Sequence, residues 1–239
     1  MKTVLILGAN SDVAKELALL YIADNYQVIM ASRDIDAMKK FIHQRKGNEA
    51  QVSFYFFDAL VTETHALFYE NLPHKPHIVV YAAGFLVQNE EAFTDFSAFQ
   101  KMAATNYTAA VSILNIIAND VRNIHLERII GLSSLSGTRG RKSNFIYGST
   151  KAAFEHYLEG LRQYLSKRKV IVNIFVLGYI DSKINQGLTL NKNLMMTPLF
   201  VAQCIKNVGK KFRHIPNWKW KIIYQIVRLL PEKLLAKLP

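Results

Sequence analysis

Tyr147 and Lys151, four residues apart, are the pair in this sequence best suited to proton transfer. On a helix this spacing places a phenol and an ammonium on the same face, one turn apart. A nearby cation lowers the pKa of a phenol from about 10 toward neutrality, where it can exchange a proton with a substrate. The same spacing recurs at Tyr179 and Lys183, so spacing alone does not select the pair.

The surrounding sequence favours the first pair. The apolar run RIIGL is followed by two hydroxyl residues, Ser133 and Ser134, upstream of Tyr147. A buried strand of this kind can deliver a serine to a cleft. The second pair follows the run VIVNIFVLG in an expected loop, where a four-residue spacing does not place two side chains on one face. We therefore interpret Tyr179 and Lys183 as incidental.

The chain alternates short apolar runs with longer helical patterns. Near-continuous apolar strands separated by helices predict a parallel sheet covered on both faces, with ligands bound beyond the carboxyl ends of the strands. We expect a single α/β, doubly wound, Rossmann-like domain. Strands are expected at TVLIL, QVIMA, VSFYFF, HIVVYA, RIIGL and VIVNIFV, and helices from about Asp12, at 34–46, at 62–72, up to about Asn119, at 145–167 and at 198–211.

The first expected strand-to-helix turn, residues 7–14, could hold a pyrophosphate on its backbone N–H groups. Only Gly8 in this turn is a glycine, so an ordinary turn with Ser11 or Asp12 as helix cap is an equal alternative. The carboxylate of Asp12 would repel a phosphate unless it turned away to cap the helix. The turn predicts a nucleotide site only in combination with other signals.

The second expected strand ends in Ser32 and Arg33. A carboxylate at this edge would bond an adenosine ribose and repel a 2′-phosphate, whereas a serine followed by an arginine does the opposite. This pattern favours NADP(H) over NAD(H). Asp34 and Asp36 keep NAD(H) open, although both are typical of a helix start.

Two further strand ends carry candidate ligand contacts. Asp58 either bonds an adenine amine or caps the segment that follows it, and the two readings are equally supported. Ala82, Ala83 and Gly84 are small enough to let a flat ring approach the backbone closely.

In this order, the motifs resemble those of the short-chain dehydrogenase/reductase family. The likeness covers residues 1 to about 185, and Ser134 precedes Tyr147 by the family's usual spacing of about 13 residues. The matching elements are Gly8-x-x-x-Asp12-x-Ala14, Tyr81-Ala82-Ala83-Gly84, Asn106 within a helix, Ser134, and Tyr147-Gly148-Ser149-Thr150-Lys151.

The resemblance implies an NAD(P)-dependent oxidoreductase acting on a carbonyl or secondary alcohol. Tyr147 would be the acid in reduction and the base in oxidation, and Ser134 would hold the substrate carbonyl. Lys151 would lower the pKa of Tyr147 and bond the nicotinamide ribose, while Asn106 would bind a water linking Lys151 to solvent. The expected cofactor-binding residues are Gly8, Asn10, Ser11, Asp12, Val13, Ser32, Arg33, Asp58, Ala82, Ala83, Gly84, Tyr147, Lys151, Gly178 and Ile180.

Three parts of the sequence depart from the family pattern. Asp12 and Ala14 stand where it prefers glycine, Tyr81 replaces Asn, and Leu177-Gly178 replaces Pro-Gly. The alternative to an enzyme is a non-catalytic relative that serves as a peripheral membrane or scaffold protein. The basic residues Arg139, Arg141 and Lys142, between Ser134 and Tyr147, could meet an anionic substrate group or be solvated loop charges.

The composition restricts the cellular compartment in which the protein is expected. A single cysteine, Cys204, excludes an intramolecular disulfide framework and fits a reducing compartment, and we interpret it as a small apolar residue. The first strand is too short for a secretory signal, and no apolar run reaches 18 residues. We assign no metal ligands. We expect a cytoplasmic protein.

The C-terminal residues are basic and amphipathic. Of the formal charge of +12, residues from Lys206 onward hold nine cations against Glu232 alone. Trp218 and Trp220, followed by aliphatic residues at helical spacing, are typical of a helix lying in the interface of an anionic membrane. The alternative is packing against the protein's own core or a second subunit in a homo-oligomer. Nucleic acid is disfavoured, because a leucine-rich basic helix lacks a polar reading face.

We therefore divide the chain into a catalytic domain, residues 1–213, and a C-terminal extension, residues 214–239. The extension is similar to those of bacterial family members that act on lipid-linked sugars, of the decaprenylphosphoryl-2-keto-ribose reductase type. This likeness implies a sugar- or lipid-linked substrate presented at the inner face of the membrane.

Overall fold

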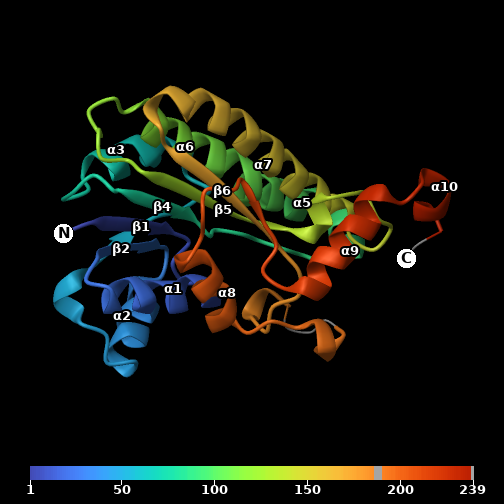
Figure 1. Ribbon diagram of the computed structural model, residues 1–239, viewed down its shortest axis with the longest axis horizontal. Coiled ribbons are helices and arrows are strands. Elements are labelled where there is room, and N and C mark those ends of the chain that lie inside the picture. Colours follow the sequence, from blue (N-terminus) through green and yellow to red (C-terminus); the bar gives the residue numbers. More distant parts are fainter. Residues whose placement is uncertain (186–189, 238–239) are drawn as a thin grey trace.

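A parallel sheet of seven strands forms the centre of the computed structural model, which describes residues 1–185 and 190–237 (Figure 1). The strand order is β3-β2-β1-β4-β5-β6-β7, and every pairing is parallel. The doubly wound α/β fold predicted from the sequence is confirmed. The strands are β1 (Thr3–Leu7), β2 (Gln27–Ser32), β3 (Val52–Phe56), β4 (Ile78–Tyr81), β5 (Arg128–Ser134), β6 (Ile171–Leu177) and β7 (Arg213–His214).

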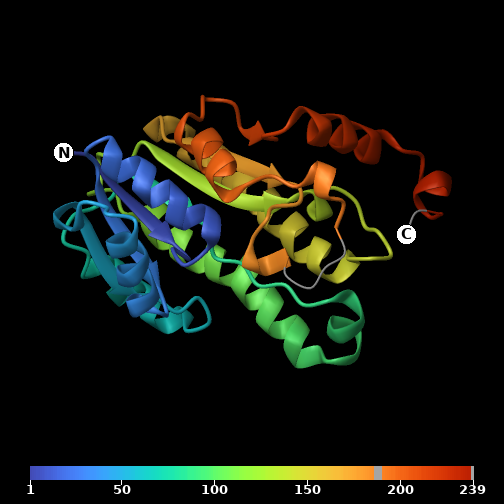
Figure 2. The ribbon, with the colours of Figure 1, turned by 90° about the horizontal axis from the view of Figure 1, so that it is seen from below.

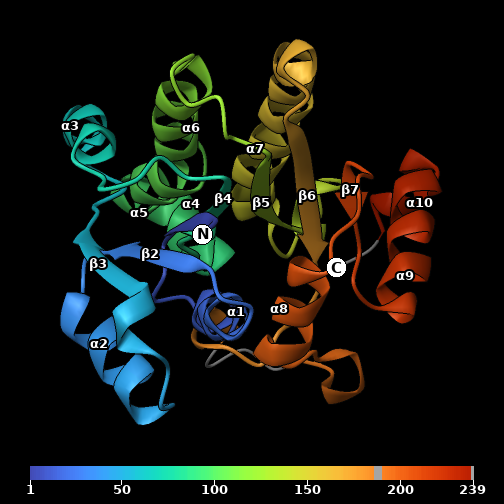
Figure 3. The ribbon, with the colours of Figure 1, turned by 60° about the vertical axis from the view of Figure 1, so that its left-hand side comes forward.

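Helices cover both faces of the sheet (Figure 3). One face carries α1 (Asp12–Ala23), α2 (Ile35–Gln44) and α8 (Pro198–Lys206), and the other carries α3 (His65–Glu70), α6 (Ala109–Asn119) and α7 (Phe145–Tyr164). All five residues of β1 are buried, as expected of a strand covered on both faces. Two apolar clusters, one on each face, form the core.

The register aligns the carboxyl ends of the central strands. Leu7 pairs with Ala31 on one side and Tyr81 on the other, and Ser134 pairs with Leu177. Residues that follow β1, β2, β4, β5 and β6 therefore meet at one edge, where the predicted ligand site lies.

The observed elements differ from the predicted ones in several places. The long helix expected before Asn119 is divided into α4 (Asn89–Thr94), α5 (Phe96–Ala103), a π-helical turn (Ala104–Thr108) and α6. The helix expected over 62–72 is a 3₁₀ turn followed by the shorter α3. β7 was not predicted, because two polar residues carry no strand pattern.

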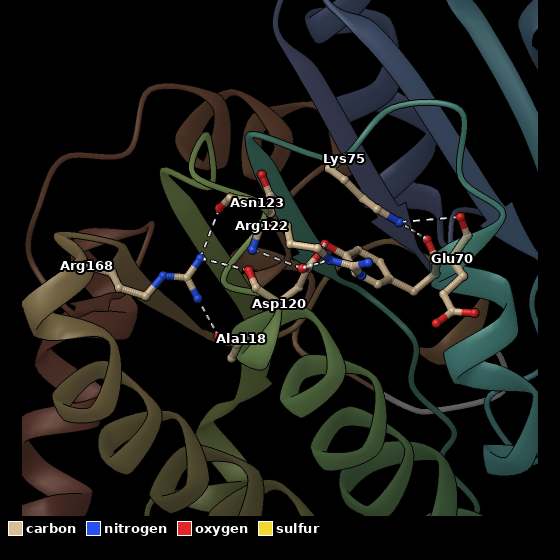
Figure 4. Close-up of polar contacts among 8 residues, drawn as sticks. Glu70, Lys75, Ala118, Asp120, Arg122, Asn123 and Arg168 are labelled. Carbon is tan, nitrogen blue, oxygen red and sulfur yellow. Dashed lines mark hydrogen bonds and ion pairs between the residues drawn. The ribbon is translucent and has the colours of Figure 1, made fainter.

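Polar contacts fasten the opposite, amino-terminal edge of the sheet (Figure 4). The guanidinium of Arg168, just after α7, donates to the carbonyls of Ala118, Asp120 and Asn123 at the end of α6. Lys75 donates to the carbonyl of Tyr69 in α3 over 2.6 Å. These bonds add side-chain donors to carbonyls at or just after the helix ends, and they lie away from the predicted site.

The C-terminal segment is joined to the sheet and to α7. The expected boundary between residues 213 and 214 falls inside β7, which pairs with β6. Arg213 forms ion pairs with Glu155 and Glu159 of α7. After β7 come α9 (Trp218–Leu229) and α10 (Glu232–Leu235), which lie at the end of the molecule opposite α2 and β3 (Figure 2).

Helix α9 has one packed face and one exposed face. Trp220, Tyr224 and Val227 are buried against the domain. The exposed face carries Trp218, Ile222, Ile226 and Leu229, all at least half exposed. Across the described residues, no helix has the length and apolar character needed to cross a bilayer.

Candidate active site

Ser134 and Tyr147 lie together beyond the carboxyl end of β5. Ser134 is the last residue of β5, and its hydroxyl hydrogen-bonds with the phenol of Tyr147 in the first turn of α7. The neighbouring hydroxyl of Ser133 instead donates to the carboxylate of Glu155 over 2.7 Å and is buried. Of the two serines, Ser134 therefore accompanies Tyr147.

Lys151 lies one turn further along α7, on the same face as Tyr147. Its ammonium donates to the carbonyl of Leu132 over 3.2 Å and lies 5.8 Å from the centroid of the Tyr147 ring. Burial lowers the pKa of Lys151 to about 8, against a smaller opposing effect of Glu155. The lysine therefore titrates near neutrality.

The pKa of Tyr147 moves in the direction opposite to our expectation. Burial of the phenol raises its pKa, and the hydrogen bond with Ser134 offsets only part of that rise. The predicted lowering by Lys151 is not among the causes of the shift, and desolvation is the largest of them. Tyr147 is consequently a protonated phenol at neutral pH, the form required of an acid.

Asn106 is held inside the π-helical turn and is fully buried. Its amide accepts from the backbone N–H of Phe85 over 2.8 Å, and it donates to the carbonyl of Phe85 and to the hydroxyl of Thr150. A Cβ placed on Gly84 would lie 3.7 Å from both the Asn106 oxygen and the Lys151 nitrogen. Asn106 therefore lies beside Lys151 and ties the segment after β4 to α7. Single π turns within helices often occur at functional sites.

Two cavities meet at the carboxyl edge of the sheet. One, of about 450 Å³, is lined by Ser134, Tyr147 and Lys151. The other, of about 600 Å³, runs from Gly8 past Arg33 to Asp58. Both are lined by Ala82, Ala83 and Gly84, so the small residues after β4 form their common wall.

The turn after β1 fits a pyrophosphate. Gly8 has φ of +80°, and a Cβ there would lie 2.4 Å from the backbone nitrogen of Ala83, so only glycine fits. Ser11 occupies the cap position of α1 but its side chain makes no capping bond. Asp12 does not cap either, because its carboxylate accepts from the backbone N–H of Lys183 over 2.8 Å. The first-turn N–H groups, including that of Val13, are thus left without a side-chain cap, as an anion would require.

The residues after β2 and β3 line the larger cavity. Asn10 donates to the hydroxyl of Ser32 over 3.3 Å and to the carbonyl of Asp34 over 2.7 Å. Arg33 is exposed beside them. The carboxylate of Asp34 caps α2 by accepting from Ala37, as its position suggested. Asp58 caps the backbone of Leu60 while also lining the cavity, so both of its expected roles are compatible with the structure.

Of the two remaining departures from the family pattern, the one at Tyr81 has a structural explanation. The hydroxyl of Tyr81 donates to the carbonyl of Thr105 over 2.7 Å, which anchors the π turn from within the core. Gly178 lies under the ring of Trp220, where a Cβ would be 2.0 Å from the indole. Gly178 and Ile180 both line the smaller cavity.

Part of the wall of that cavity is formed by residues that the sequence did not place at the site. Trp220 and Ile223 of α9 line it, and the indole of Trp220 donates to the carbonyl of Leu194 over 2.8 Å. We had expected these residues to face a membrane, a partner or the core. The signal in the sequence was the spacing of Trp220, Tyr224 and Val227, which places three apolar residues on one face of a helix.

The second Tyr–Lys pair behaves as predicted. Tyr179 packs edge-on against Trp220, with ring centroids 5.0 Å apart, and Lys183 begins a separate 3₁₀ turn (Lys183–Asn185). The two residues do not share a helix. Cys204 is partly buried in α8, where burial raises the pKa of its thiol, consistent with a packing role.

Comparison with known proteins agrees with this geometry. The family model for short chain dehydrogenases matches residues 2–193. An uncharacterized oxidoreductase of Mycobacterium tuberculosis is 29% identical over 243 residues, covering 99% of this chain and 96% of the relative. One of Streptomyces coelicolor is 26% identical over 244 residues, with the same coverage of both chains.

Solved structures show the same fold at lower identity. A short chain dehydrogenase from Burkholderia cenocepacia in complex with NADP has a TM-score of 0.83 and 15% identity, covering 98% of this chain and 97% of that one. ElxO with NADP bound has a TM-score of 0.79 and 21% identity, covering 92% of this chain and 99% of that one. With a family model matching most of its length, this chain belongs to the short chain dehydrogenase family.

Proposed function

We propose that this protein is an NADPH-dependent oxidoreductase that interconverts a ketone and a secondary alcohol. The observation that carries the proposal is the hydrogen-bonded pair of Ser134 and Tyr147, with Lys151 one turn away, beside the wall where two cavities meet. NADPH, when bound, supplies the hydride.

The residues of this chain then manage the charge that develops on the substrate oxygen. Ser134 donates a hydrogen bond to that oxygen and holds it beside the phenol. Tyr147, protonated at neutral pH, gives its proton to the oxygen as the negative charge grows. Lys151, when charged, stabilises the resulting phenolate until it regains a proton. In the oxidation direction the same atoms act in reverse.

The preference for NADPH rests on the residues at the end of β2 and just after it. Ser32 and the exposed Arg33 line the larger cavity, and the nearest following carboxylate, Asp34, is engaged in capping α2. A serine and a guanidinium can hold a 2′-phosphate, whereas a carboxylate there would repel it. Two of the structural neighbours described above were solved with NADP, which supports the same assignment.

The catalytic assignment is tested by the substitution Tyr147→Phe. Removal of the acid should reduce turnover by about 10²–10⁴-fold, the range typical of general acid catalysis. NADPH binding, followed by nucleotide fluorescence, should be retained. Tyr164→Phe is a matched control, because Tyr164 is the last residue of α7, is exposed and does not line either cavity. Undiminished turnover of a ketone by the Tyr147→Phe variant would refute the assignment.

A lipid-linked or sugar-linked substrate at an anionic membrane is our proposal for the setting of the reaction. The exposed apolar face of α9 and the basic residues around it support this, since such a face can lie in a membrane interface while Trp220 stays packed. Ile223 adjoins the smaller cavity, so the cavity wall and the exposed face belong to one helix.

Flotation with anionic and neutral liposomes tests the membrane setting. The triple substitution Trp218→Ser, Ile226→Ser and Leu229→Ser removes exposed side chains and should abolish flotation with anionic liposomes without loss of fold. Equal flotation of both proteins would reject the proposal. Concentration-dependent dimerisation without liposome binding would instead assign the face to a second copy of the chain.

A further inference from the structure

The wall of the smaller cavity is polar on one side and apolar on the other. Arg141, in the segment between β5 and α7, lines the cavity, as do Leu194, Trp220 and Ile223. Among the described residues lining it, none is an aspartate or glutamate, and its charged residues are Arg141 and Lys151. The lining is therefore basic. The carboxylate of Glu155, which acts on Lys151, is bonded to Ser133 and Arg213 and does not line the cavity.

The segment that contains Arg141 holds an unusual share of unpaired polar atoms. Five buried side-chain polar atoms in the described part of the chain lack a hydrogen-bond partner. Three of the five lie here: the hydroxyl of Thr138, Nε of Arg141 and the amide oxygen of Asn144. Buried polar groups normally find partners, so a cluster of exceptions calls for an explanation such as a missing ligand.

The other basic residues of the segment do not share this position. Arg139 donates to the carbonyls of Arg228 and Leu230 at the end of α9, each over 3.3 Å. Lys142 is exposed and does not line the cavity. Arg141 alone of the three combines a place on the cavity wall with a buried donor that has no partner.

Arg141 does not line the larger cavity, which contains Gly8, Arg33 and Asp58. The smaller cavity also contains Ser11 and Val13 of the expected cofactor site. An anion that binds at Arg141 while NADP⁺ is present would therefore be a group of the substrate and not of the nucleotide.

We propose that Arg141 binds an anionic oxyacid group of the substrate, a carboxylate or phosphate, while Trp220 and Ile223 receive its apolar part. A guanidinium binds both oxyacids through paired N–H groups, and reorientation toward such an acceptor would satisfy the donor now left unpaired. The predicted substrate class is thus a ketone with an acidic group on one side and an apolar chain on the other. This inference rests on the proposed function for the position of the ketone at Tyr147.

Binding can be separated from turnover by titrating the protein with and without NADP⁺, which cannot reduce a ketone. We would measure dissociation constants by calorimetry for a medium-chain 3-oxo carboxylate, its neutral methyl ester and a ketone phosphate of similar size. The wild type should bind the anions about 10- to 100-fold more tightly than the ester, as expected of a charge-assisted pair. Tighter binding of only one of the two anions would show whether the acidic group of the substrate is a carboxylate or a phosphate.

Substitutions then assign the preference to a residue. Arg141→Gln should remove the preference and leave ester binding unchanged, Arg141→Lys should restore part of it, and Lys142→Gln should leave it intact. Equal binding of anions and ester by the wild type, or a preference that survives in Arg141→Gln, would overturn the inference. Selective anion binding without NADPH oxidation for any ketone would reject the proposed reaction while supporting the anion site.

Discussion

At the scale of single residues, burial decides the protonation of the two groups that would move protons. Desolvation raises the pKa of Tyr147 and lowers that of Lys151 to about 8. The phenol is therefore a proton donor through the neutral range. The lysine changes charge near the pH at which the protein would work, so it is the group expected to set the pH dependence.

Carbonyl reduction should become slower above about pH 8. Lys151 is charged below its folded pKa of about 8 and neutral above it, so stabilisation of the Tyr147 phenolate is lost as the pH rises. The measurement is kcat/KM for ketone reduction between pH 6 and 10.5. In Lys151→Arg the guanidinium stays charged throughout this range, so the decline near pH 8 should vanish. An unchanged decline in that variant would assign it to another group.

Nucleotide choice should depend on Arg33. Its replacement by Ala removes the cation proposed to hold the 2′-phosphate and should weaken NADPH binding by about 10- to 100-fold, the range for a charge-assisted hydrogen bond. NADH binding should change little. Titration of the wild type and of Arg33→Ala with both nucleotides gives the ratio of the dissociation constants for NADPH and NADH. Arg45→Ala is the control, because Arg45 is an exposed arginine that pairs with Glu16 on the outer surface. An unaltered ratio would argue against NADPH selection by this residue.

At the scale of elements, one buried ion pair joins β7 to α7. Arg213 pairs with Glu155, which is buried and also accepts from Ser133 beside the active site. Burial raises the pKa of Glu155, and its bonds with Ser133 and Arg213 hold that rise in check. The placement of β7, and of α9 after it, therefore draws on this cation–carboxylate contact as well as on strand pairing with β6.

Arg213→Met should destabilise the protein by on the order of 3 kcal/mol at pH 8, because it leaves a carboxylate buried without its cation. The pKa of Glu155 would rise further in this variant. Between the ordinary pKa of a glutamate and the raised pKa of Glu155, the native state keeps a proton that the unfolded state releases. The free energy of unfolding therefore falls as the pH rises through this interval. Urea unfolding should show a smaller deficit at pH 5 than at pH 8. Glu159→Gln, at the more exposed partner, should cost much less.

At the scale of the whole molecule, the C-terminal segment forms part of the wall of the smaller cavity. Trp220 covers Gly178 and bonds the carbonyl of Leu194, while Lys219 donates to the carbonyl of Asn193 over 3.1 Å. Helix α9 therefore holds the segment after β6 against the smaller cavity. The larger cavity shares neither Trp220 nor Ile223.

Trp220→Ala should raise the KM for the ketone substrate by about tenfold or more while NADPH affinity stays within about twofold. Removal of a buried aromatic side chain also costs about 3–5 kcal/mol of stability, so the Tm should fall. Trp218→Ala is the matched control, because Trp218 is 65% exposed on the same helix. Equal effects of the two substitutions on KM would mean that α9 does not form the substrate wall.

The sequence by itself determined the sheet and most of the residues at its edge. Apolar runs such as TVLIL have one stable placement, a strand buried on both faces, and the parallel order then brings Gly8, Gly84 and Ser134 to the same edge. The order of local motifs also separated Tyr147–Lys151 from Tyr179–Lys183. These predictions depend on periodicity and on short spacings, which the chain carries locally.

Only the tertiary structure decided the features that join residues far apart in the chain. Two of these features are contacts between residues more than 30 positions apart: that of Asp12 with Lys183 and that of Trp220 with Gly178. The third is the raised pKa of Tyr147, which depends on burial. The spacing of apolar residues in α9 predicts that one face of the helix is buried, but it does not predict which part of the protein packs against that face. Desolvation likewise follows from the assembled core, because the same phenol on an isolated helix would be hydrated.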